Sequence, residues 1–207
     1  MTRMQRPHQP VCLNVFVEDD LGAALIRRII QEYGDKFAEP ILRVTSGFGA
    51  IKRQIQKYNE AARRCPMLIC TDLDNSNCAP AKIAEWLPNG IHPNLMLRIA
   101  VREVESWVMA DRETFAGYLH VPETIVPVNP EAEPDPKKRL IDIARRSRKR
   151  TLREALVPKA NSQAKVGRDY NGTLIQYVQY DWRPSIARTN SDSLDRTMRR
   201  LASFQIQ

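Results

Sequence analysis

Short apolar runs alternate with helical patterns through the first half of the chain. Four such runs are bounded by polar or turn residues, as is typical of buried strands: Val11–Val17, Ile41–Val44, Met67–Thr71 and Leu95–Val101. Apolar residues at helical spacing follow each run, over about 20–33, 50–64, 79–87 and 103–110. This alternation predicts an α/β fold with a parallel sheet flanked by helices.

The second half of the chain shows helical patterns only. Segment 121–136 contains five prolines, which predicts a stiff linker or an extended loop. Helical patterns follow over about 137–156, 171–180 and 191–204. We therefore predict an α/β domain over residues 1–120, a proline-rich segment over 121–136, and a helical C-terminal portion, 137–207, packed on the core.

The composition limits the classes of protein that need to be considered. The chain has 207 residues, of which 43% are hydrophobic, enough to form a packed core. No stretch approaches the roughly 18 apolar residues of a membrane-spanning helix. The first ten residues lack the apolar segment of a signal peptide, so we expect a cytoplasmic protein without a membrane partner.

Charge and cysteine content narrow the chemistry. Lys and Arg number 32 against 24 Asp and Glu, a net charge of +8, which favours a polyanion or an acidic protein surface as partner. The three histidines are scattered, which disfavours a histidine-based mechanism. No C-x-x-C spacing occurs, and we expect reduced, mostly buried cysteines at Cys12, Cys65, Cys70 and Cys78.

Carboxylates stand where the first and third strands end. Glu18 follows the first strand, and Asp72 and Asp74 follow the third. Parallel strands joined by right-handed crossovers end at one edge of the sheet, so these acids can be neighbours. The spacing of two would place both aspartates on one face of an extended segment. Clustered carboxylates repel one another, and a hard cation such as Mg²⁺ between them explains the cluster best.

Some of these acids have a structural alternative, and two further acids lie at the same predicted edge. Aspartates are common in turns and at helix N-caps, and Asp20 in particular could simply cap the first helix. Glu103 and Glu105 follow the fourth strand at the same predicted edge, where one of them could complete a second metal site. Acids in the first turn of a helix are also favoured by the helix dipole, which is the alternative for this pair.

Three motifs together resemble a known family. They read Val17-Glu18-Asp19 with Asp72-x-Asp74, then Arg102-x-Glu-x-Glu-x-Trp107, and finally Ser191-x-Ser-Leu-x-Arg196. This set resembles the Toprim domain of topoisomerases, primases and OLD-type nucleases, and more closely the small standalone Toprim-like proteins of bacteria. The Toprim part covers about residues 11–110. The chain departs from the family where Asp19 replaces a common glycine and Gly22 replaces a nuclease-type glutamate.

The resemblance implies Mg²⁺-dependent cleavage of DNA or RNA, with one or two Mg²⁺ ions and Mn²⁺ as a substitute. It implies metal ligands and catalytic acids at Glu18, Asp72 and Asp74, further help from Glu105 or Glu103, and a substitute ligand at Asp19 or Asp20. It also implies an ABC- or SMC-like ATPase companion in bacterial antiphage defence. The alternative is a non-catalytic, basic Toprim-like subunit that binds nucleic acid or an ATPase.

Basic segments in the second half indicate where a substrate could bind. Lys137–Arg139 and Arg145–Arg150 place many cations on one helical stretch, which is either a solvated face or a phosphate-binding face. Serine hydroxyls and arginine side chains suit phosphate oxygens. We therefore predict nucleic-acid contacts for five residues: Lys159, Lys165, Arg168, Ser193 and Arg196. The alternative for the serine is a role in capping the last helix.

Overall fold

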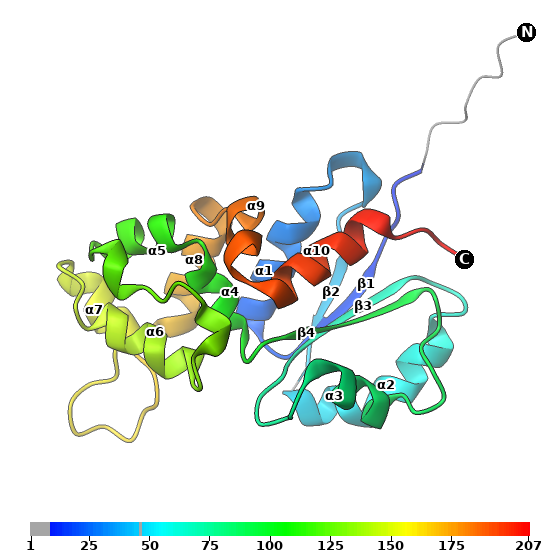
Figure 1. The fold of residues 1–207 in the computed structure, drawn as a ribbon, viewed down its shortest axis with the longest axis horizontal. Helices are drawn as coiled ribbons and strands as arrows, with labels where there is room; N and C mark the ends of the chain where they lie inside the picture. The colour runs from blue at the N-terminus through cyan, green and yellow to red at the C-terminus, as the bar shows by residue number, and fades with distance from the viewer. Residues whose placement is uncertain (1–8, 46) are drawn as a thin grey trace, which may run out of the picture.

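The computed structural model describes residues 9–45 and 47–207, so residues 1–8 of the predicted first domain lie outside the description. Within the described chain, four parallel strands form one sheet in the order β2-β1-β3-β4 (Figure 1). They are β1 (Asn14–Val17), β2 (Ile41–Val44), β3 (Met67–Asp72) and β4 (Leu95–Ala100). This is the predicted α/β fold with a parallel sheet, and it is consistent with a Toprim-like layout.

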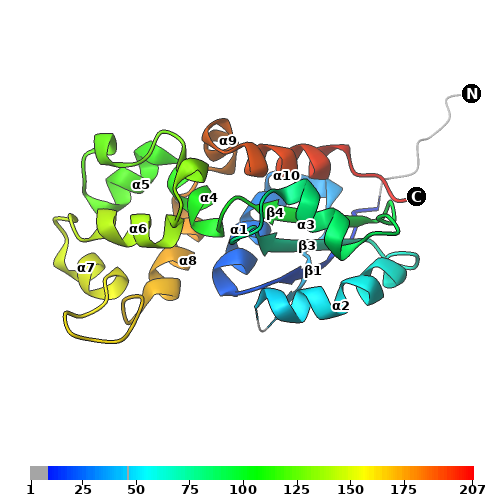
Figure 2. The ribbon, with the colours of Figure 1, turned by 60° about the horizontal axis from the view of Figure 1, so that its bottom comes forward.

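Helices cover both faces of the sheet, which explains why β3 is buried along its length. Helices α2 (Phe48–Ala61) and α3 (Ala79–Trp86) pack on one face through Ile51, Ile55 and Trp86. Helix α1 (Asp20–Gln31) and helix α10 (Asp192–Ser203) contribute apolar side chains to the core of the other face. Figure 2 shows α2 and α10 on opposite sides of the strands.

The C-terminal part is helical, as predicted, but its helices are shorter and more numerous than the pattern indicates. Besides α10, its helices are α6 (Pro136–Ala144), α7 (Arg150–Leu156), α8 (Tyr170–Tyr180) and α9 (Pro184–Ala187). Helices α4 (Val104–Ala110) and α5 (Arg112–Leu119) precede them, within the predicted first domain. Short 3-10 turns, η1 to η4, lie at Gly34–Lys36, Glu123–Ile125, Pro130–Ala132 and Arg188–Asn190. Sequence reasoning missed α5 and α9.

The single helix predicted over 137–156 is wrong, because the structure divides it into α6 and α7. The Ser147 hydroxyl accepts a hydrogen bond from the backbone N–H of Lys149 at 3.1 Å. Arg153 donates to the carbonyl of Ser147. Serine bonding to its own neighbouring backbone competes with helix formation, so the chain turns at this point.

The proline-rich segment lies against the core. Val126 and Pro130 are buried, and η2 and η3 fall within the segment. The side-chain oxygen of Asn129 accepts from the backbone N–H of Glu131 at 3.2 Å and starts η3. Prolines therefore shape a packed connection here.

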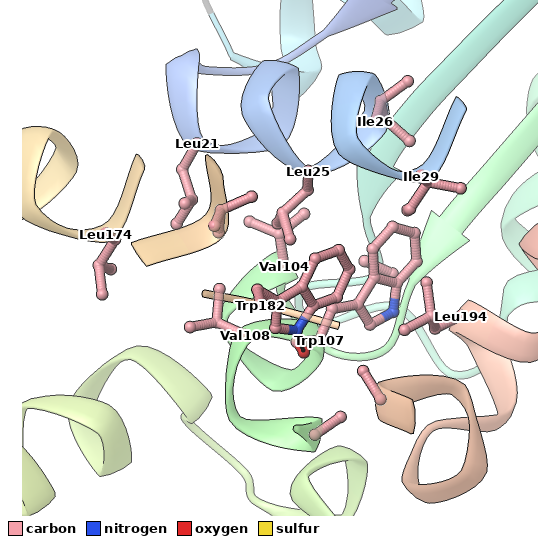
Figure 3. Packing of buried hydrophobic residues seen from close by; sticks show 14 of the residues in the cluster. Leu21, Leu25, Ile26, Ile29, Val104, Trp107, Val108, Leu174, Trp182 and Leu194 are labelled. Atoms are coloured by element: carbon pink, nitrogen blue, oxygen red, sulfur yellow. Dashed lines mark hydrogen bonds between the residues drawn. The ribbon is translucent and has the colours of Figure 1, made fainter. Parts of the chain in front are cut away.

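Two tryptophans join the helical part to the sheet (Figure 3). Trp107 of α4 and Trp182 are buried, between α1 side chains such as Leu25 and α10 side chains such as Leu194. The Trp182 indole N–H donates to the carbonyl of Trp107 at 3.0 Å, and the Trp107 indole N–H donates to Ser193 Oγ at 2.7 Å. Both polar groups are thus satisfied inside the core. Val108 and Met109, which follow Trp107 in α4, are buried as well.

The expectation of mostly buried cysteines is wrong. All four are free thiols, but only Cys70 is buried, whereas Cys12 and Cys78 are exposed. Cys12 alternates with the inward-facing Val11 and Leu13, and Cys78 occupies the N-cap of α3. In the described part of the chain, no helix has the length and apolar character needed to cross a membrane.

Candidate functional site

Glu18 and Asp72 meet at the carboxyl edge of the sheet. Glu18 directly follows β1, and Asp72 is the last residue of β3, the strand next to it. The Glu18 Oε1 atom accepts a hydrogen bond from the backbone N–H of Asp72 at 3.0 Å and another from the Thr71 hydroxyl. Two acids that lie far apart in the sequence are therefore held side by side by the parallel pairing of their strands.

Asp72 links this edge to α4. Its Oδ1 atom accepts from the backbone N–H of Val104, the first residue of α4, at 3.0 Å. Burial raises the pKa of Asp72 well above its ordinary value, and the carboxylates of Glu105, Glu18 and Asp74 raise it further. Burial also raises the pKa of Glu18. These shifts indicate a cluster of acids whose negative charge is poorly compensated.

Asp74 does not share a face with Asp72, so the extended geometry expected for this pair is wrong. Strand β3 ends at Asp72, and Asp74 adopts a left-handed backbone with φ of 51°. Its carboxylate lies 3.5 Å from the ammonium group of Lys82. Lys82 is only 3% exposed and also donates to the carbonyl of Asp72. A buried lysine therefore holds the turn and partly neutralises Asp74.

Glu105 is buried, unlike Glu18, Asp72 and Asp74, which are partly exposed. It is 1% exposed, its Oε1 atom lies 3.3 Å from the ammonium group of Lys137, and it accepts from the Tyr170 hydroxyl at 3.1 Å. Its Oε2 atom is buried and has no hydrogen-bond partner in the described chain. Burial raises the pKa of Glu105 to about 7, although Lys137 acts in the opposite direction. A carboxyl group with this pKa can change protonation state near neutral pH.

The remaining predicted acids have local structural partners or lie in solvent. Glu103 Oε2 accepts from the backbone N–H of Lys137 at 3.0 Å, which ties it to the first turn of α6. Asp19, and not Asp20, caps α1, because its Oδ1 atom accepts from the backbone N–H of Gly22 at 2.8 Å. Asp20 is the exposed first residue of that helix.

Two of the predicted acids, Glu18 and Asp72, are the candidate donors for a cation at this edge. Among residues 9–45 and 47–207, no group of three or more His, Cys, Asp or Glu side chains is arranged to hold a metal ion. Asp74 faces Lys82 and Glu103 faces α6, which leaves Glu18 and Asp72 as the paired donors. Mg²⁺ is commonly held by one or two carboxylates together with waters and substrate phosphates, and this donor set suits that mode.

The five predicted nucleic-acid contacts separate into two groups. Lys159 and Arg168 line a cavity of about 500 Å³ in the C-terminal part, and Lys165 is exposed on the loop beside it. Ser193 and Arg196 line a different cavity of about 300 Å³ beside β4. The structure therefore does not bring all five residues to one surface.

Ser193 has a structural role in this arrangement. It is 6% exposed, and its hydroxyl group bonds with Glu131 and with the Trp107 indole. Ser191 caps α10 by accepting from the backbone N–H of Leu194 at 3.2 Å, which is the alternative considered for the serines. Arg196 forms an exposed ion pair with Asp192 at 2.7 Å.

We call the carboxyl edge with Glu18, Asp72, Asp74 and Glu105 the acidic edge. Sequence reasoning missed four residues that contact these acids: Thr71, Lys82, Lys137 and Tyr170. Thr71 had a visible signal, since it directly precedes the predicted Asp72 ligand on the same strand. Lys137 belonged to a basic run whose individual members could not be distinguished. No local pattern marks Lys82 or Tyr170, because their contacts join separate elements of the fold.

Comparison of the chain with models of protein families, with curated proteins and with solved structures finds no match. We therefore argue function from the residues of the acidic edge and from the motifs that resemble Toprim proteins.

Proposed function

We propose that this protein is a Mg²⁺-dependent nuclease that cleaves phosphodiester bonds of DNA or RNA. The observation that carries the proposal is the pairing of Glu18 with Asp72 at the carboxyl edge, where burial and the carboxylates of Glu105 and Glu18 raise the pKa of Asp72. A divalent cation would relieve this repulsion. The same edge is where open parallel sheets bind ligands.

The acids have different parts in the proposed reaction. Glu18 and Asp72 would hold Mg²⁺, and Lys82 keeps the neighbouring Asp74 turn in place. A bound Mg²⁺ supplies a water of lowered pKa and neutralises charge on the phosphate. Glu105, whose pKa is about 7, is suited to exchange a proton at neutral pH.

Charge supports nucleic acid as the substrate class. The chain carries a net charge of +8, although its acidic edge would by itself repel a phosphate backbone. The ATPase companion and the role in defence that the resemblance implies stay predictions.

Paired substitutions at the two ends of the strands test this proposal. We expect Glu18→Gln and Asp72→Asn each to lower cleavage of DNA or RNA in Mg²⁺ or Mn²⁺ by about 100-fold or more, because each removes a donor for the cation that stabilises the developing charge. Asp35→Asn is the matched control, because Asp35 is exposed in η1, before β2 begins. This variant should cleave like wild type.

A binding measurement separates a catalytic edge from a structural one. Calorimetry with Mn²⁺ should show site-specific binding to wild type and to Asp35→Asn, and weakened binding to Asp72→Asn. Equal cleavage by wild type and Asp72→Asn would refute the mechanism. Absence of both cleavage and Mn²⁺ binding in the wild-type chain would instead support the non-catalytic, nucleic-acid-binding subunit.

A further inference from the structure

The positive charge of this protein is concentrated in about one sixth of the chain, residues 136–169. Residues 136–169 contain twelve Lys and Arg against three Asp and Glu, a net charge of +9 where the whole chain has +8. The rest of the molecule therefore carries about −1. This stretch forms α6, α7 and the loop that leads to α8, which lie at the end of the molecule away from the sheet (Figures 1 and 2).

The basic stretch lines an open cavity, which we call the basic cavity. It measures about 500 Å³, and its charged lining consists of one acid and four cations: Glu154, Arg145, Arg153, Lys159 and Arg168. Val157 and Pro158 complete the lining. The surplus of cations identifies an anion as the ligand that electrostatics would favour here.

A glycine fixes the shape of the basic cavity. The backbone N–H of Gly167 donates to the carbonyl of Leu156 at 3.0 Å, which closes the loop 157–167 onto the end of α7. A Cβ atom at Gly167 would lie 2.1 Å from the carbonyl oxygen of Ala155, so only glycine allows this close approach. Lys159 and Arg168 thereby stand near the two ends of one closed loop.

These cations differ in whether an acid already neutralises them. Arg145 pairs with Asp142 at 2.6 Å, and Glu154 pairs with Arg150 at 2.6 Å. Lys159 and Arg168 form no ion pair within the part of the chain that the structure describes, and both are exposed. Their charge is available to an incoming anion.

We propose that the basic cavity binds phosphate groups of a nucleic-acid backbone, as an anchor separate from the acidic edge. The choice of nucleic acid over another phosphate-bearing ligand rests on the proposed nuclease function. Helix α6 connects the two places, because Lys137 contacts Glu105 at one end and Arg145 lines the cavity at the other. Lys137 and Arg145 are eight residues apart, which is a rise of about 12 Å at roughly 1.5 Å per residue.

Binding in EDTA tests the anchor without any contribution from the metal. Fluorescence anisotropy would follow a labelled 20-nucleotide single strand and the matching duplex at several salt concentrations. We expect Lys159→Ala/Arg168→Ala to weaken binding by about tenfold and to lower the slope of log K against log salt by about 1.4 for the single strand and 1.8 for the duplex, since each lost phosphate contact removes about 0.7 or 0.9.

The control removes the same two charges elsewhere. Lys57→Ala/Arg64→Ala deletes one exposed lysine and one exposed arginine from α2 and the residues just after it, and should change binding less than twofold. Equal effects of the two double variants would overturn the proposal, because the binding would then reflect net charge alone. An unchanged salt slope in Lys159→Ala/Arg168→Ala would overturn it as well.

Small ligands distinguish the source of the phosphate. Inorganic phosphate and a nucleoside triphosphate should compete with the oligonucleotide only at millimolar concentration. Competition by either at micromolar concentration would overturn the backbone assignment in favour of a free-phosphate or nucleotide pocket. The binding assay contains EDTA and therefore does not depend on the metal site. If Asp72→Asn loses cleavage in Mg²⁺ but binds the oligonucleotide in EDTA like wild type, the anchor proposal is supported. If Lys159→Ala/Arg168→Ala binds like wild type, the anchor proposal fails, and the nuclease proposal is still decided by the cleavage assay.

Discussion

The carboxylates at the acidic edge differ in the groups that surround them. The Glu18 carboxylate is oriented by Thr71 and by the backbone of Asp72, whereas Asp74 faces a buried lysine. Glu105 is buried between Lys137 and Tyr170 with one oxygen unbonded. An unbonded buried oxygen costs free energy, so this carboxylate lowers the stability of the fold when it is ionised.

Burial of Glu105 predicts a pH-dependent stability in the metal-free protein. Its pKa is about 7 in the folded chain against an ordinary value of 4.5, so the folded state binds more protons than the unfolded state between these values. The free energy of unfolding should therefore fall as pH rises from 4.5 to 7 and level off above 7. The whole effect is about 3 kcal/mol at most.

Urea unfolding in EDTA from pH 4.5 to 8 measures this effect. Glu105→Gln keeps an acceptor for the Tyr170 hydroxyl but cannot ionise. Its stability relative to wild type should increase with pH through the same window. Parallel curves for the two proteins would contradict the assignment.

Elements of the C-terminal part end where backbone groups find partners outside a helix. Ser147 interrupts the stretch predicted as one helix, and Gly167 closes the loop after α7. Both features shape the basic cavity, because Arg145 precedes the break and Arg168 follows the closure. The cations are thus placed by two local backbone devices.

Two glycine substitutions test the loop closure. Gly167→Ala should lower the free energy of unfolding by about 1–3 kcal/mol, because its Cβ would overlap the carbonyl oxygen of Ala155. Gly117→Ala is the control: it lies within α5 with no atom within 4 Å of its Cβ position, and should be neutral or stabilising by about 0.5–1 kcal/mol. Chemical denaturation compares both with wild type, and equal effects would exclude close packing at Gly167.

At the scale of the whole molecule, acidic and basic regions are separate and are joined by α6. The acidic edge lies at the ends of β1 and β3, and along α6 the rise from Lys137, which contacts Glu105, to Arg145, which lines the basic cavity, is about 12 Å. A duplex strand advances about 3.4 Å per phosphate along its axis. A substrate bound at both places would span at least three to four phosphates, since the rise along α6 is only part of the separation.

This separation predicts a minimum substrate length on one side of the cleaved bond. Duplexes that extend well beyond four base pairs toward the cavity should be cleaved faster by wild type than by Lys159→Ala/Arg168→Ala at moderate salt. Duplexes trimmed to two base pairs on that side should be cleaved at the same rate by both proteins, because such a duplex is too short to reach the anchor. Initial rates over a series of lengths measure this, and a rate difference that persists on the shortest duplex would contradict it.

The sequence alone determined the α/β fold, the helical C-terminal part and the placement of Glu18 beside Asp72. Strand periodicity is a local property, and parallel pairing forces strand ends to a common edge, so these features follow from pattern and topology.

Only the tertiary structure decided which polar groups meet. It turned Asp74 toward Lys82, placed Lys137 and Tyr170 against Glu105, buried Ser193 beside Trp107, and grouped Lys159 and Arg168 in one cavity. Each of these contacts depends on side-chain packing or on a turn with a particular backbone conformation. Residue spacing carries no record of such contacts, because a single displaced turn changes which side chains face each other.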